Sequence, residues 1–115
     1  MNTKSLLDHC VNALEDNKAL DIKTLDVTGF SDVTDYMIVC TGTSSRHTKS
    51  LADNLIKAIK ENGFKLLSHE DDEASDWVLV DLGDVIVHIM LATTRQFYDL
   101  ESLWKYNETK GSKKT

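Results

Sequence analysis

Apolar residues recur at helical spacing in two stretches of the chain. The first pattern predicts an amphipathic helix from about residue 3 to residue 17. The second predicts a helix that Ser44 or Ser45 caps and that ends at residues 62–63, where Asn-Gly is typical of a helix C-terminus. The apolar positions are Leu6, Leu7, Cys10, Val11 and Leu14 in the first helix, and Leu51, Leu55, Ile56 and Ile59 in the second. Each helix therefore has one face that requires burial.

Five other stretches are rich in strand-forming residues. The predicted strands are residues 22–27, 36–41, 64–67, 77–82 and 85–91. The last two are separated only by a turn at Gly83 and should form an antiparallel hairpin. Strands 36–41 and 64–67 flank the second helix, so they should run parallel if they share a sheet.

The remaining segments complete a single α/β domain. We expect the acidic residues 68–76 to form a loop, and Thr93 to begin a Thr-x-x-Gln capping box that opens a last helix. The expected architecture is one mixed sheet of about five strands flanked by helices. It should span residues 1–107, followed by a disordered Lys-rich tail at 108–115.

Alternation within the predicted hairpin separates two faces of the sheet. Strand 85–91 is apolar on both faces, which is typical of a central strand. In strand 77–82 one face is wholly apolar, with Val78, Val80 and Leu82. The opposite face carries Trp77, Leu79 and Asp81. If the first face is the core, the second must be covered by a helix or by a partner.

Composition and charge narrow the class of protein. The chain has 115 residues, 41% of them hydrophobic, and a net charge of −6. Residues 70–84 contain seven carboxylates and no Lys or Arg. Such a segment repels nucleic acid and anionic lipid and attracts a basic partner. The alternative is a solvated acidic loop without a partner. The acidic charge predicts no direct sequence-specific nucleic acid binding. The chain has no secretory signal pattern and no apolar run long enough to span a membrane, so we expect it to be cytoplasmic and without membrane contact.

The turn at residues 42–47 is the strongest local motif for a ligand. Its side chains Thr43, Ser44, Ser45 and Arg46 could hold a phosphate at a helix N-terminus, although helix capping alone also explains them. The Gly-rich motifs of nucleotide-binding loops are absent. The four histidines show no metal-binding spacing, so no metal or cofactor is expected.

Aromatic residues beside carboxylates indicate a protein interface. Trp77 lies close to Asp81 along its strand, and Tyr98 lies close to Glu101 on the last helix. Trp and Tyr are frequent anchors of protein interfaces. The alternative is that both aromatic side chains complete the core.

Three segments together closely resemble one family. Residues 35–47, 77–88 and 95–104 resemble the ribosomal silencing factor family, also called Iojap-related proteins, and the resemblance extends over about residues 4–105. It implies a fold similar to that of nucleotidyltransferases but no enzyme activity. Those enzymes require an Asp-x-Asp motif to hold magnesium, and the corresponding stretch here has only Asp53.

The resemblance also implies a function and a partner. Such a factor binds the large ribosomal subunit through its ribosomal protein fourteen, blocks an intersubunit bridge and represses translation. The expected partner-binding residues are Trp77, Leu79, Asp81, Tyr98 and Glu101. A homodimer of the free protein is compatible with this function, because an exposed apolar face can pair with itself. The alternative is a nucleotidyltransferase-type enzyme, or a nucleotide-binding protein, that uses the turn from Gly42 to His47.

Overall fold

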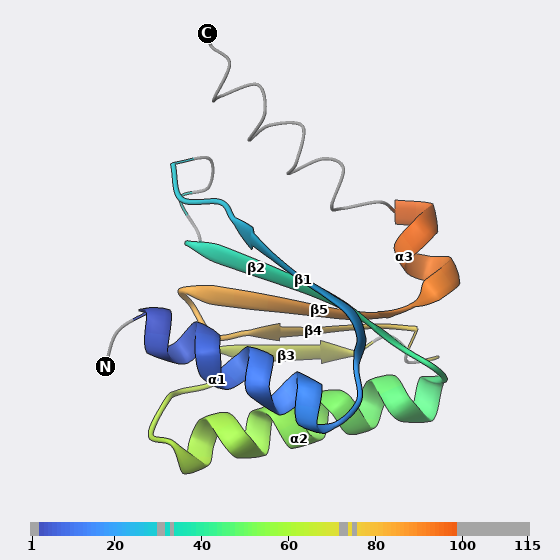
Figure 1. The fold of residues 1–115 in the computed structure, drawn as a ribbon, viewed down its shortest axis with the longest axis horizontal. Helices are drawn as coiled ribbons and strands as arrows, with labels where there is room; N and C mark the ends of the chain where they lie inside the picture. The colour runs from blue at the N-terminus through green and yellow to red at the C-terminus, as the bar shows by residue number, and fades with distance from the viewer. Residues whose placement is uncertain (1–2, 30–31, 33, 72–73, 75, 99–115) are drawn as a thin grey trace, which may run out of the picture.

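The fold has three helices and five strands in the part of the chain that is described (Figure 1). The computed structural model describes residues 3–29, 32, 34–71, 74 and 76–98. In chain order the elements are α1 (Thr3–Asp16), β1 (Leu20–Asp26), β2 (Tyr36–Gly42), α2 (Ser45–Glu61), β3 (Ser68–Asp71), β4 (Trp77–Asp81), β5 (Val85–Leu91) and α3 (Ala92–Tyr98).

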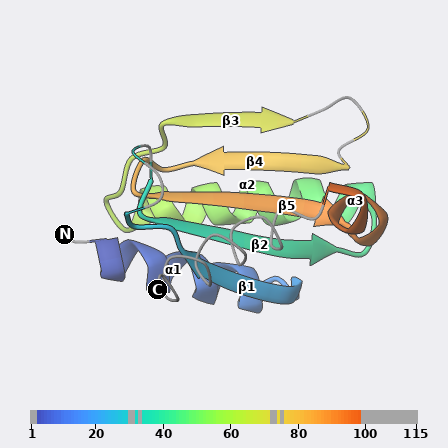
Figure 2. The same cartoon turned by 90° about the horizontal axis from the view of Figure 1, so that it is seen from above.

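The strands form one mixed sheet in the order β1-β2-β5-β4-β3 (Figure 2). Strands β2 and β5 pair in parallel, and the other neighbours pair antiparallel. The predicted hairpin of β4 and β5 is confirmed, and so is the central place of β5. The α/β class with a mixed sheet of five strands is therefore confirmed.

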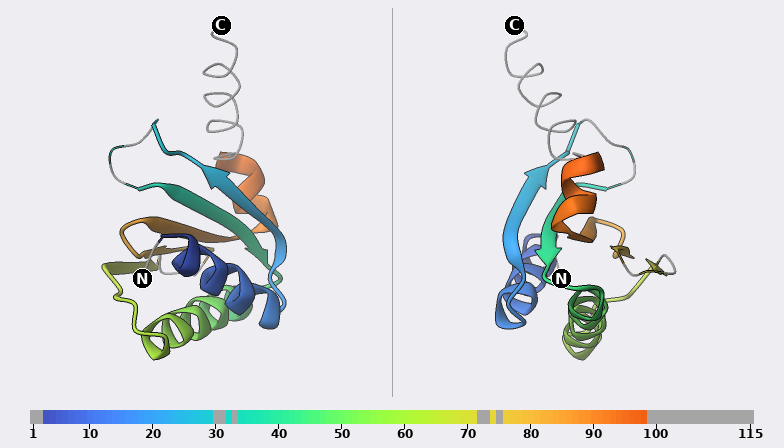
Figure 3. Two further views of the ribbon diagram at one scale, coloured as in Figure 1. Left: turned by 60° about the vertical axis from the view of Figure 1, so that its left-hand side comes forward. Right: turned by 90° about the vertical axis from the view of Figure 1, so that its right-hand side faces the viewer.

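Two helices cover one face of the sheet. Helices α1 and α2 lie on the same side, and α3 lies on the other (Figure 3). The predicted apolar stripe of α2 is buried, and Leu51, Leu55 and Ile59 are at most 1% exposed. They belong to one cluster with Val80 of β4 and Val87 of β5, both 0% exposed. This cluster is the main core.

We call the side of the sheet away from α1 and α2 the outer face. It is formed by Leu25, Met37, Val39, Trp77, Leu79, Asp81, Ile86, His88 and Met90. Helix α3 packs against the β5 and β2 end of this face, where Nη1 of Arg95 donates hydrogen bonds to the carbonyl oxygen of Asp21 (2.7 Å) and to Oγ1 of Thr41 (2.8 Å). Asp21 has a φ of 47° at an irregularity in β1, so Arg95 ties α3 to a strained point of the edge strand.

The strand predicted at residues 64–67 is wrong. Those residues form no strand, and β3 lies at Ser68–Asp71, inside the predicted acidic loop. The exposed side chains of β3 tolerate charge because this edge strand needs only backbone pairing with β4. Strand β3 is antiparallel to β4, and it therefore runs parallel to β2, as the helix connection predicted.

The predicted cap of the last helix is also wrong. Helix α3 begins at Ala92, directly after β5 ends at Leu91, so Thr93 lies inside the first turn rather than before it. The chain passes from strand to helix without a linker, which the capping-box pattern does not reveal.

Gly42 is required where β2 turns toward α2. A Cβ atom at this position would lie 2.6 Å from Cγ2 and 3.0 Å from the backbone nitrogen of Thr48, which is fully buried. We expect Gly42→Ala to lower the free energy of unfolding by about 2 kcal/mol, as overpacking of a buried site does, measured by urea denaturation. Adding Thr48→Ser removes Cγ2 and should restore part of the loss. No recovery in the double variant would contradict this cause.

Candidate protein interface on the outer face

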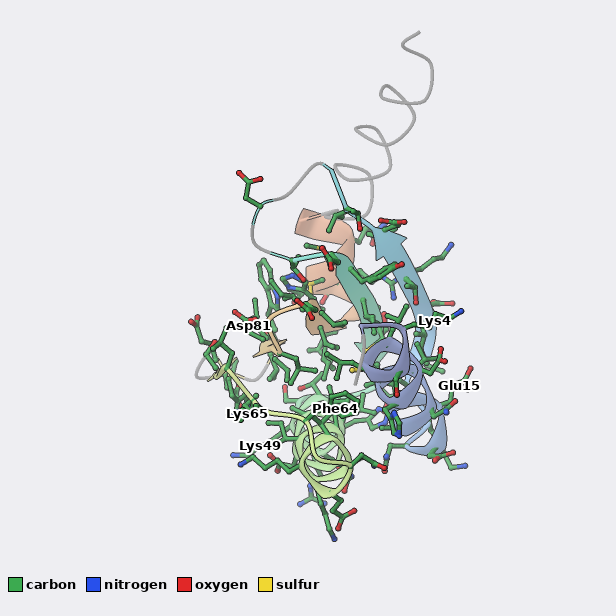
Figure 4. The ribbon with its side chains drawn as sticks, turned by 90° about the vertical axis from the view of Figure 1, so that its left-hand side faces the viewer. Lys4, Glu15, Lys49, Phe64, Lys65 and Asp81 are labelled. Carbon is green, nitrogen blue, oxygen red and sulfur yellow. The ribbon has the colours of Figure 1, made fainter. Side chains whose placement is uncertain are left out.

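Three predicted partner-binding residues lie together on the outer face. Trp77, Leu79 and Asp81 occupy alternate positions of β4 and are each half-buried, whereas the intervening Val78 and Val80 are 0% exposed on the helix-covered side. The two faces deduced from alternation are therefore confirmed. In Figure 4, Asp81 lies on β4, with Lys65 and Lys49 beneath it toward α2.

The neighbouring strands extend this surface. Leu79 lies opposite His88 of β5 on one side and opposite Glu70 of β3 on the other. Residues opposite each other in antiparallel strands point to the same face. The exposed carboxylate of Glu70 therefore borders the apolar side chain of Leu79, and Asp81 adds a second carboxylate on the same strand. An apolar centre with an acidic rim results.

The Asp81 carboxylate also has a local structural role. Its Oδ1 accepts a hydrogen bond of 2.9 Å from the backbone N–H of Gly83 in the β4–β5 turn. Gly83 has a φ of 88°, a conformation that favours glycine. The hydrogen bond to the turn holds the carboxylate in place at the end of β4, so its charge is presented from a fixed position.

Trp77 and His88 form a specific pair. Nε1–H of Trp77 donates a hydrogen bond of 3.0 Å to Nδ1 of His88, and the ring centroids are 5.7 Å apart at 51°. Because Nδ1 accepts, the imidazole is neutral with its proton on Nε2. Burial lowers the pKa of His88 from 6.5 to about 4, which keeps the ring neutral at pH 7. His88 is therefore a buried histidine whose ring is hydrogen-bonded within the sheet.

The sequence did not reveal that Trp77 and His88 are partners. The signal that could have found the pair is the hairpin register, since a tight turn at Gly83 places Leu79 opposite His88 and Trp77 opposite Met90. The structure adds the exposed Glu70 to the rim of the candidate interface, and it adds the buried His88 as the hydrogen-bond partner of Trp77.

Two further predicted contacts fall at or beyond the end of the described residues. Tyr98 is the last residue of α3 and only its backbone is described, and Glu101 lies outside the described residues. The tail at 108–115 and the domain limit at 107 lie outside them as well. These assignments stay predictions.

The turn after β2 is organised as a helix cap. Oγ of Ser44 accepts a hydrogen bond of 3.1 Å from the backbone N–H of His47, and Nδ1 of His47 accepts one of 2.9 Å from the backbone N–H of Thr43. Nε2 of His47 lies 3.0 Å from the carbonyl oxygen of Asn17, which ties the turn to the end of α1. Ser45 Oγ donates to Asp76 at 3.3 Å, and Arg46 is exposed. Two backbone donors of the turn thus already have intramolecular acceptors.

Ser44→Ala separates capping from anion binding. We expect this variant to lose about 1 kcal/mol of unfolding free energy, because the N–H of His47 loses its acceptor. Thermal or urea denaturation measures the loss. If the turn also binds an anion, phosphate at about 10 mM should raise the free energy of unfolding of the wild type more than it raises that of Ser44→Ala. Equal stability of the two proteins without phosphate would contradict the capping role.

Among the described residues, no group of three or more His, Cys, Asp or Glu side chains is placed to hold a metal ion. Within that same part of the chain, no helix has the length and apolar character needed to cross a membrane. Asp53 is an exposed residue of α2.

The fold and the outer face define a small α/β protein whose open sheet surface has an aromatic and apolar centre and an acidic rim. Comparison with known proteins identifies its family. The family model described as "Ribosomal silencing factor during starvation" matches residues 1–115. A ribosomal silencing factor from Haemophilus influenzae is 46% identical over 100 residues, covering 87% of this chain and 98% of that protein. The chain belongs to the ribosomal silencing factor family.

Two other proteins extend the comparison. A crystal structure of protein CV0518 from Chromobacterium violaceum matches with a TM-score of 0.88 and 41% sequence identity. The match covers 91% of this chain and 88% of the chain in that crystal structure. The mouse protein named "Mitochondrial assembly of ribosomal large subunit protein 1" is 35% identical over 101 residues, covering 85% of this chain and 44% of that protein. The resemblance deduced from the three segments is confirmed, and this chain is a translation regulator of the ribosome-silencing class.

Proposed function

We propose that the chain binds the large ribosomal subunit through its ribosomal protein fourteen and thereby prevents the small subunit from joining. The observation that carries the proposal is the outer face, where Trp77 and Leu79 form an apolar centre and Asp81 and Glu70 an acidic rim. Family membership supports a ribosomal target, and the name of the mouse relative supports the large subunit.

Charge favours a protein component of the ribosome as the contact. The chain has a net charge of −6, and a negative protein is repelled by the phosphate backbone of ribosomal RNA. A basic ribosomal protein is attracted to the acidic rim, and complementary charge of this kind accelerates association and orients the partners. Trp77 would then contribute most of the binding energy by burying its ring against that protein.

Silencing by this route requires only occupancy. A domain bound at the joining face excludes the small subunit sterically, so no reaction has to be catalysed. Joining is suppressed by mass action, in proportion to the fraction of large subunits that carry the factor. We propose that this takes place in the cytoplasm, and that the outer face pairs with a second copy when no ribosome is bound.

Charge reversal on the two sides of the sheet tests which surface docks. Glu70 on β3 and Asp53 on α2 are both exposed carboxylates, but only Glu70 borders the outer face. We expect Glu70→Lys to slow association with purified large subunits several-fold at low salt and to weaken the salt dependence, whereas Asp53→Lys leaves both unchanged. Stopped-flow or surface-based kinetics measure the rates. Equal effects of the two variants would contradict docking through the outer face.

A further inference from the structure

The hydrogen bond between Trp77 and His88 lies in the middle of the outer face. His88 is on the central strand β5 and is 7% exposed, whereas Trp77 on β4 is half-buried. A side chain as buried as His88 offers almost no area to a partner. Any effect of His88 on binding must therefore be transmitted through a neighbour that a partner can reach, and Trp77 is hydrogen-bonded to it.

The chemistry of the two rings makes this contact directional. An indole has a single polar hydrogen, and the neutral imidazole offers one lone pair in a defined direction. With donor and acceptor 3.0 Å apart and the rings tilted by 51°, rotation of the indole about its side-chain bonds would break the hydrogen bond. The indole also packs against the cluster that contains Met90, the residue opposite it in the register. The ring is thereby held in one orientation from two sides.

We propose that His88 is a positioning residue that holds the Trp77 indole in its binding-competent orientation before the partner arrives. The inference rests on the proposed function and deepens it by naming the residue that prepares the anchor. Ordering a large side chain on binding opposes association, and a side chain that is already ordered avoids that loss. His88 then determines affinity without touching the partner.

Three substitutions separate positioning from packing. His88→Leu keeps a side chain of similar size but removes the acceptor. His88→Asn restores an acceptor, because Oδ1 of asparagine occupies nearly the place of Nδ1. Trp77→Phe keeps an aromatic ring and removes the donor. The double variant with His88→Leu and Trp77→Phe completes a double-mutant cycle. Comparing the double variant with the two single variants isolates the interaction between the two side chains.

Binding to purified large subunits and the NMR signal of the indole N–H are measured for each variant, with circular dichroism to verify folding. We expect His88→Leu to weaken binding about tenfold and to accelerate hydrogen exchange of the Trp77 indole, and His88→Asn to retain wild-type behaviour within about threefold. In the Trp77→Phe background, His88→Leu should have no further effect on affinity. If His88 served only in packing, His88→Leu would lower the stability of the protein, and its effect on affinity would be the same with Trp77 or with Phe at position 77.

The outcomes that overturn the inference are distinct from failure of the proposed function. Folded His88→Leu that binds as tightly as the wild type would overturn it, and so would a loss of affinity that persists in the Trp77→Phe background. If His88→Leu does not fold, Trp77→Phe alone decides, because wild-type affinity without the donor would show that the hydrogen bond is not needed. If the wild type itself does not bind large subunits, the proposed function fails, and unchanged indole exchange in His88→Leu would overturn positioning separately.

Discussion

Replacing Trp77 by alanine is expected to weaken binding to the large ribosomal subunit by about 30-fold or more, equivalent to about 2 kcal/mol. Trp77 is the largest side chain of the β4 surface, lies next to Leu79 and is held in place by His88. Truncation removes the ring that a partner would bury and exposes part of the cluster around Met90. Equilibrium binding to purified subunits measures the change, at a temperature where circular dichroism shows the variant to be folded.

A matched control lies on the opposite side of the molecule. Ile56 on α2 is also half-buried and packs against the main core, so Ile56→Ala removes apolar area without touching the outer face. It should leave the affinity within about twofold. Adding Tyr98→Ala to Trp77→Ala should abolish measurable binding. A folded double variant with normal affinity would refute the assignment of the interface.

The stability of the chain is expected to fall by about 3 kcal/mol between pH 6.5 and pH 4 because of His88. Its pKa is lowered from 6.5 to about 4 by burial, and each pKa unit corresponds to about 1.4 kcal/mol. The unfolded chain therefore binds a proton below pH 6.5 while the folded chain does not, so acid favours unfolding until the folded His88 titrates near pH 4. Protonation also removes the lone pair that accepts from Trp77.

Urea denaturation at several pH values, compared between the wild type and His88→Asn, isolates this contribution. The charged groups on the outer face include Lys23, Glu70, Asp81 and Arg95, and all are retained in the variant. The other three histidines are retained too, so their contributions cancel in the difference. We expect the variant to have a shallower pH dependence than the wild type. Identical dependence in both proteins would show that His88 is not the group that titrates.

The sequence predicts the hairpin well because burial there follows a strict pattern. Val78 and Val80 alternate with half-buried residues, and β5 is apolar on both faces, so both the pairing and the central position could be deduced. Strand β3 could not be predicted from the sequence. Its residues are Ser-His-Glu-Asp, and an edge strand whose side chains are mostly exposed has no apolar alternation to reveal it.

The candidate interface could be predicted only in part for a similar reason. Alternation identified Trp77, Leu79 and Asp81 as sharing a face, because it depends on neighbours along one strand. The additions His88 and Glu70 depend on register between strands, which short-range patterns leave open. The hydrogen bond of Arg95 to Asp21 joins residues 74 positions apart, and no local pattern indicates it.

We propose that this chain prevents the ribosomal subunits from joining, and a joining experiment tests this most directly. Purified large and small subunits are mixed at a magnesium concentration that permits joining, with and without the protein, and are separated on a sucrose gradient with each fraction probed for the chain. We expect fewer joined ribosomes as the protein concentration rises, and we expect the chain to sediment with the large subunit. Trp77→Ala should not have this effect. Normal joining with the chain remaining at the top of the gradient would contradict the proposal.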